Sequence, residues 1–253
     1  MAKQLLIYEN ATPVNRSRHG NLSVKAGGDY SFSVEVNSVP LMVAEFAQVA
    51  NDMTIVFAGQ GDEIIPAVLL GVRENENLFV DADGKWLGKY VPAFLRRYPF
   101  VFSSSDDGET FTLCFDESFE GAISDGRGVR LFDAEGEQTQ YLRGVLGFLQ
   151  AYQVQFQRTK ELTRRLRQLN LLEPMQAQFT LRGGRNLMLS GFEVVSRDRL
   201  KGVTSDQLAT LFASEDLELI YLHLQSLRNL QATAERLGIA SETPTAPEQE
   251  TAA

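Results

Sequence analysis

The chain has 253 residues, of which 43% are hydrophobic and 23% are charged, a composition typical of a globular protein with a sizeable core. Its formal net charge of -9 at pH 7 opposes general binding to nucleic-acid phosphates, so we expect no nucleic-acid partner. The single cysteine, Cys114, excludes an intrachain disulfide and any metal cluster built from several cysteines, which fits a reducing compartment.

The first residues contain one short apolar run, residues 5–8, which is too short for the core of a signal peptide. No apolar run approaches the roughly 20 residues that a helix needs to cross a bilayer. We therefore expect a cytoplasmic protein without a membrane span.

The first half of the chain predicts one helix and several short strands. Ser38 is a candidate helix cap and Pro40 suits a first turn, so a helix of about three to four turns is expected to follow. Thr54–Ala58 and the segments 64–70 and 77–80 are short apolar runs separated by glycines, which predicts neighbouring strands. The apolar positions of the expected helix are Met42, Phe46, Val49, Ala50 and Met53.

Residues 81–84 and 133–136 have the same order of residue types, an aspartate first and a glycine last. Aspartate can bond its own backbone and glycine accepts a positive φ, so both segments predict tight turns. Neither supplies the glutamate at the twelfth position that a calcium-binding EF-hand loop needs.

The segment 139–169 predicts one long helix, because apolar residues recur at intervals of three and four and no proline interrupts it. At 1.5 Å per residue such a helix is about 45 Å long, so it either spans the domain or projects toward a partner, including a second copy of the chain in a homodimer. Its far end is basic. The apolar positions are Leu142, Val145, Leu146, Leu149, Tyr152, Phe156, Leu162, Leu166 and Leu169.

The last third predicts a β-hairpin followed by helices. The apolar runs 175–181 and 187–195 flank a Gly-Gly pair, which is typical of a hairpin. Thr204 and Gln207 match a capping box, and a further helix is expected to begin near Ser214. From residue 241 the chain has no large apolar residue, so an acidic, disordered tail is expected.

These elements predict an α+β fold, with short-strand mixed or antiparallel sheets in the first half and the long helix, hairpin and helices in the second. We expect one domain over residues 1–240, with two packed lobes, 1–138 and 139–240, as an alternative. Residues 241–253 form the tail.

No complete catalytic, phosphate-binding or metal-binding motif is present, so no cofactor and no metal are expected. His223 is placed to orient Ser226 or to lie in a packed helix interface. His19 is in a polar loop, where it closes over a site or is simply solvated. Cys114 lies in a strand-like apolar run, which predicts a thiol buried in the core.

Arg96, Arg97 and Tyr98 are the strongest candidates for binding a ligand. A guanidinium fork beside an aromatic ring suits carboxylate or phosphate, although arginines also tie structural elements together through internal ion pairs. Glu45, on the helix expected after Pro40, is the carboxylate that we add to this candidate site.

Several separate blocks, in order over residues 5–237, resemble the SapC family of bacterial proteins. These blocks include Val39-Pro40-Leu41, Glu45-Phe46, Ile55-Val56-Phe57, Val91-Pro92-Ala93, Arg96-Arg97-Tyr98-Pro99-Phe100, Gly191-Phe192-Glu193 and Tyr221-Leu222-His223-Leu224. The resemblance brings no catalytic residue set. It implies an association with surface-layer proteins and outer-membrane receptors.

Three hypotheses follow. The first is a non-enzymatic binding or accessory protein of surface-layer or outer-membrane nutrient-uptake systems, which takes a peptide-like or acidic ligand at Arg96, Arg97 and Tyr98. The second is an enzyme acting on a peptide or amino-acid derivative, in which His19, Glu45 and His223 meet in one pocket with iron or zinc. The third is a homodimeric scaffold that pairs through the long helix.

Overall fold

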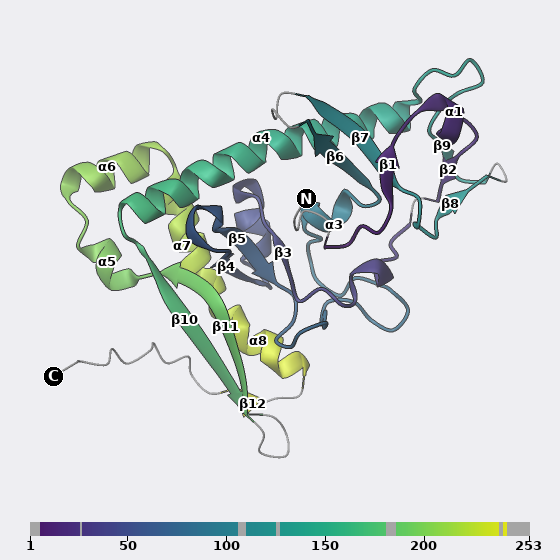
Figure 1. The fold of residues 1–253 in the computed structure, drawn as a ribbon. Coiled ribbons are helices and arrows are strands. Elements are labelled where there is room, and N and C mark those ends of the chain that lie inside the picture. Colours follow the sequence, from purple (N-terminus) through teal and green to yellow (C-terminus); the bar gives the residue numbers. More distant parts are fainter. Residues whose placement is uncertain are drawn as a thin grey trace.

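The computed structural model describes residues 6–25, 27–105, 110–124, 127–180, 186–237 and 240–241. Its strands pair antiparallel wherever their pairing is described, and helices pack on the sheets (Figure 1). The predicted α+β class is confirmed. Among the described residues, no helix combines the length and the apolar character of a membrane-spanning segment.

The largest sheet has six strands in the order β12-β10-β11-β4-β5-β3 and takes them from both halves of the chain. The hairpin β10–β11 joins the strands of the first half where Phe192 pairs with Ala58 and Glu193 with Phe57. The strands are β3 (Ser38–Pro40), β4 (Thr54–Ala58), β5 (Ile65–Leu69), β10 (Leu172–Thr180), β11 (Asn186–Val195) and β12 (Ala240–Ser241).

Two three-stranded sheets complete the strands, in the orders β1-β7-β6 and β8-β2-β9. In the first, Phe100 of β6 pairs with Phe115 of β7, and both rings enter one apolar cluster with the long helix. The strands are β1 (Ala11–Pro13), β2 (Ser23–Val24), β6 (Phe100–Ser104), β7 (Phe111–Asp116), β8 (Ala122–Ile123) and β9 (Val129–Arg130).

The long helix α4 (Gln140–Gln168) confirms the prediction made from its apolar spacing, and Thr139 caps it by accepting a hydrogen bond from the Leu142 amide. Leu142 and Leu149 pack in the cluster of Phe100 and Phe115, whereas Leu162 packs in the main core with strands of the six-stranded sheet. Figure 1 shows α4 running the length of the molecule. The helix therefore spans the body; pairing of two copies through it stays a prediction.

The basic end of α4 is tied to the body of the protein. Arg165 forms an ion pair with the buried Asp216, Arg158 with Glu215, and Arg167 donates to the carbonyl of Gly61. The other helices are short. They are α1 (Arg16–His19), η1 (Ser31–Ser33), η2 (Val43–Glu45), α2 (Phe46–Val49), η3 (Gly61–Glu63), α3 (Ala93–Arg96), α5 (Arg197–Lys201), α6 (Ser205–Ala213), α7 (Asp216–Ser226) and α8 (Asn229–Arg236).

The helix expected after Pro40 is shorter than predicted and begins later. Ser38 does not cap it, because β3 pairs there with β5 and the Leu41 amide continues the pairing by donating to Pro66. The helical residues are confined to η2 and α2. Pairing with a distant strand has overridden a local cap signal, which propensity alone cannot reveal.

Of the other local predictions, most are confirmed and one is wrong. Both aspartate turns form, with Asp81 accepting from the Lys85 amide and Asp133 from the Glu137 amide, and the capping box of Thr204 is present. The strand predicted over residues 77–80 is wrong, because among these residues only Val80 takes part in a β-bridge, which is an isolated one. The two hairpin strands are confirmed, while the Gly-Gly turn and residues 242–253 lie outside the described residues.

Three polar side chains of α7 and α8 bond backbone groups of β4, of β11 and of the turn that precedes β4. The register of β11 on β4 places Val195 opposite Ile55, and the imidazole of His223 lies between them: the Val195 amide is 3.0 Å from Nε2 and the Ile55 carbonyl 3.0 Å from Nδ1. Because Nε2 accepts from an amide, Nδ1 must carry the proton. Ser226 accepts from the Ile55 amide, and Asn229 donates to the carbonyls of Ala50 and Met53.

We expect His223 to make stability depend on pH. Burial lowers the pKa of His223 from 6.5 to about 4. Between pH 6.5 and pH 4, the imidazole is therefore protonated in the unfolded chain and neutral in the folded chain. The contribution is fully present above pH 6.5 and is lost as pH falls to about 4, a change of about 3 kcal/mol. His223→Gln, which does not titrate, lacks this component. Urea unfolding of both proteins between pH 7 and pH 4 measures it, and parallel pH profiles would contradict the prediction.

Candidate functional site

The Arg96, Arg97 and Tyr98 triplet lies where the short helix α3 ends and β6 begins. Pro92 opens α3, whose buried residues Ala93, Phe94 and Leu95 anchor it in the core. The apolar face of one helical turn therefore fixes the backbone from which the three polar side chains project.

All three side chains line a cleft with a volume of about 1250 Å³. Tyr141, Val145 and Phe148 from the first half of α4 also line the cleft. The segment around Tyr30 and Phe32 and the segment around Phe119 complete the lining among the described residues. The cleft carries both signs of charge, from Lys25, Arg96, Arg97, Glu9, Asp29 and Glu120.

Arg96 is exposed but held in place. Its Cζ lies 5.3 Å from the ring centroids of both Tyr90 and Phe148, so the guanidinium is placed between two aromatic faces. Nε donates to the carbonyl of Val91 at 3.0 Å, and Nη2 to the hydroxyl of Tyr90 at 2.7 Å. Nη1 has no partner among the described residues, so a fixed fork keeps donors free for a ligand in the cleft.

Glu45 is linked to Arg96 through the hydroxyl of Tyr90. Its side chain is buried and accepts hydrogen bonds from the amides of Met42 at 3.0 Å and Ala93 at 2.6 Å and from the Tyr90 hydroxyl at 3.0 Å. Burial raises the pKa of Glu45, against these hydrogen bonds, which favour the ionised form. Glu45, Tyr90 and Arg96 thus form one hydrogen-bonded chain from the core to the cleft.

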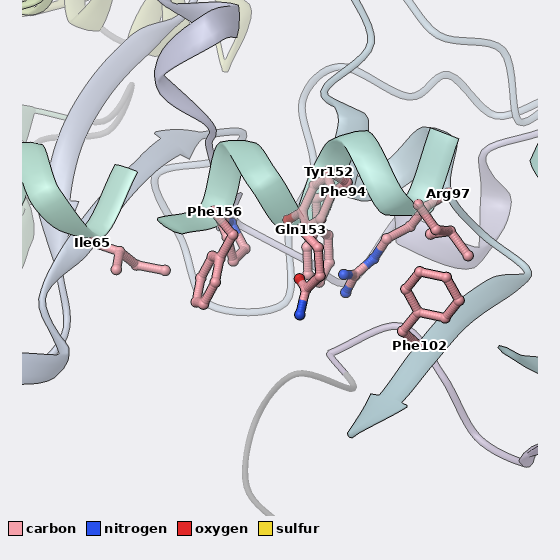
Figure 2. A pocket seen from close by; sticks show the side chains of 9 residues that line it. Ile65, Phe94, Arg97, Phe102, Tyr152, Gln153 and Phe156 are labelled. Atoms are coloured by element: carbon pink, nitrogen blue, oxygen red, sulfur yellow. The ribbon is translucent and has the colours of Figure 1, made fainter. Parts of the chain in front are cut away.

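Arg97 is buried, with 8% of its surface exposed. Its Cζ lies 4.2 Å from the ring centroid of Phe94, 5.0 Å from that of Tyr152 and 5.6 Å from that of Tyr8. The same side chain also lines a second, smaller cavity of about 120 Å³ (Figure 2). Arg97 therefore forms part of the wall between the two spaces.

Tyr98 belongs to an aromatic cluster at the cleft. Its ring stacks on Phe32 with a centroid separation of 4.1 Å and contacts Tyr8 at 5.4 Å and Phe119 at 5.5 Å. Burial, followed by the nearby Asp116 carboxylate, raises the pKa of Tyr98 to about 12. The phenol is therefore neutral at physiological pH and offers a ring face and a hydroxyl.

His19 is buried and is not among the described residues that line the cleft. Its Nδ1 accepts from the Asn15 amide at 3.2 Å, and Nε2 is 3.3 Å from Oε1 of Glu117, which also pairs with Arg18. The ring packs edge-on against Phe115. These contacts tie α1 to the end of β7.

The structure does not bring His19, Glu45 and His223 into one cavity. Figure 1 places α1 and α7 in opposite parts of the molecule, and His223 and Ser226 are fully buried with backbone partners. Among the described residues, no three His, Cys, Asp or Glu side chains form a group able to hold a metal. The pKa of Cys114 is raised by burial. A joint catalytic role of His19, Glu45 and His223 therefore has no common site in this structure.

Tyr90 and Phe148, which hold Arg96, were not among the candidates from the sequence. Tyr90 is six residues before Arg96 in the same aromatic block, which was the only available signal. Phe148 lies 52 residues after Arg96 and falls on the apolar face of the long helix, so its spacing marks it as a packing residue but not as a partner of Arg96.

Comparison with known proteins decides the family. A family model described as SapC matches residues 14–232, most of the chain. The chain belongs to the SapC family. No curated protein and no solved structure matches it significantly. The match includes the whole triplet, Glu45, Tyr90 and the first half of α4, so the cleft of this SapC protein lies largely within the family region.

We expect Tyr90→Phe to lower the free energy of unfolding by about 1–3 kcal/mol, because the buried carboxylate of Glu45 loses one of its three donors. Tyr221→Phe is the matched control, since Tyr221 is exposed on α7. Urea unfolding at pH 7 measures both. Equal stability of the two variants would show that the Tyr90 hydroxyl does not support Glu45.

Proposed function

We propose that this SapC-family protein is a binding or accessory protein whose cleft takes an acidic, peptide-like ligand, with a carboxylate held by Arg96. The observation that carries the proposal is the fixed guanidinium: two ring faces and two hydrogen bonds hold it while Nη1 faces no described partner. A donor fork that is ordered before binding loses little side-chain entropy when it meets a carboxylate.

The rest of the cleft supports a peptide-like ligand over a simple polyanion. The lining contains the acidic side chains of Glu9 and Glu120 as well as the basic ones of Lys25 and Arg96, so a ligand with both an ammonium and a carboxylate group finds partners of each sign. The rings of Tyr30, Phe32 and Phe119 offer apolar surface for a side chain.

The setting of this binding follows from the family and is part of the proposal. The resemblance to the SapC family implies an association with surface layers, and on that basis we propose a partner among the proteins and peptides of surface-layer or outer-membrane nutrient-uptake systems. A surface-layer protein fragment and short acidic peptides are therefore the first ligands to test.

We expect Arg96→Ala to weaken binding of an uncapped Glu-rich tripeptide about tenfold or more, because a charge-assisted hydrogen bond contributes roughly 1.5–3 kcal/mol. Arg96→Lys keeps the charge without the planar fork and is expected to recover part of the loss. Isothermal titration calorimetry at low and at high salt measures both effects.

Arg164→Ala is the matched control for this series. Arg164 is exposed near the far end of α4, and its replacement changes the net charge of the protein by the same amount. Binding that is equally strong in wild type and Arg96→Ala, or equally weakened by Arg164→Ala, would contradict the role of Arg96.

A further inference from the structure

Among the described residues, strand β6 has a neighbouring strand on one side only, because the sheet order is β1-β7-β6. The hydrogen bonds at its two ends fix which residues face that neighbour. Pro99 accepts from the Asp116 amide, and Ser105 donates to the carbonyl of Thr110. In an antiparallel pair this orientation alternates along the strand, so residues 101 and 103 also direct their backbone groups toward β7.

The same alternation directs the backbone groups of Phe102 and Ser104 to the free edge. Two further bonds agree: the Phe100 amide, two residues earlier, bonds Arg97 rather than β7, and the carbonyl of Leu113, opposite Phe102, accepts from Val14 of the other neighbour. No described residue bonds the backbone of Phe102 or Ser104. Ser103 and Ser104 are exposed, so this edge is open to solvent.

The smaller cavity lies beside this edge. Its lining includes Phe102 from β6 and no residue of β7, while Pro40 and Ile65 from the six-stranded sheet form the opposite side. Figure 2 shows Ile65 and Phe102 at the two ends, with Phe156, Gln153 and Arg97 between them. The cavity therefore borders Phe102 of β6, the six-stranded sheet and α4.

We propose that the free edge of β6 docks an extended peptide segment of a partner protein, which adds a strand to the sheet and places one large apolar side chain in the cavity. Unpaired amides and carbonyls at alternate residues are complementary to an extended backbone. The cavity of about 120 Å³ is similar in size to one that holds a benzene ring, which fits a leucine or phenylalanine side chain.

The charge beside the cavity selects further among peptides. Among the described residues of its lining, only Arg97 is charged, so a carboxylate next to the apolar residue is favoured over an ammonium group. This docking edge is a different surface from the cleft of Arg96, and the inference stands whether or not that cleft binds an anion.

The probe is the peptide acetyl-Thr-Thr-Leu-Thr-Glu-Thr-amide, whose Leu and Glu side chains point to the same side of an extended chain. We expect it to bind the full-length protein more tightly than about 1 mM and to slow hydrogen exchange at the amides of Phe102 and Ser104. Replacing its Leu by Ala is expected to weaken binding about tenfold or more, because the apolar contact is lost.

Ser104→Pro removes the edge amide without touching the bonds to β7, and proline is tolerated on edge strands. We expect it to weaken the peptide at least about tenfold, whereas Ser103→Ala, whose amide faces β7, leaves binding unchanged. Gln153→Phe, which fills the cavity from α4, is the second variant. We expect it to weaken binding of the Leu peptide more than binding of the Ala peptide.

Absence of binding by the Leu peptide, or equal binding by wild type and both Ser104→Pro and Gln153→Phe, would overturn the proposal. Binding lost in Arg96→Ala but kept in Ser104→Pro would place the peptide in the cleft and also overturn it. Loss in Ser104→Pro with full binding by Arg96→Ala would support the docking edge alone, which keeps this test separate from that of the proposed function.

Discussion

The packing of one face of α4 against two sheets determines where both cavities lie. Leu142 and Leu149 hold the helix on the β1-β7-β6 sheet, and Leu162 holds it in the core of the six-stranded sheet. Val101 of β6 and Cys114 of β7 share the main core with strands of the six-stranded sheet, and Thr159 of α4 accepts from the Val43 amide. A rigid helix that contacts both sheets fixes their separation, so the space between β6 and the edge of β3 and β5 stays open as a cavity.

Buried ionisable groups in this protein complete backbone hydrogen bonding where regular elements stop. Glu45 accepts the amides at the starts of η2 and α3, and His223 joins two strands that have separated too far to bond directly. Burial disfavours the charged form of each, which raises the pKa of Glu45 and lowers that of His223. Both groups have a structural role, and Glu45 also reaches the cleft through its hydrogen bond with the Tyr90 hydroxyl and its charge interaction with Arg96.

Sequence patterns predicted the features that depend on neighbours along the chain. The apolar spacing of residues 139–169, the two aspartate turns and the capping box of Thr204 all depend on contacts within a few residues. Ser38 failed as a helix cap because its partner strand is some 30 residues away. The triplet at Arg96 was found from residue type, but the aromatic pair that holds Arg96 was not, because Phe148 reaches it only through the folded position of α4.

The free edge of β6 shows a further limit of sequence patterns. The run Phe100–Ser104 predicts a strand equally well whether one or two neighbours pair with it, since alternation reports buried faces and not edges. Only the sheet order shows that no described strand pairs with the outer side of Phe102 and Ser104. Arg97, held by three rings, then forms part of the wall of both the cleft and the cavity beside this edge. The two proposed sites are thus neighbours across a single ordered side chain, so the shape of either one depends on the packing that holds Arg97.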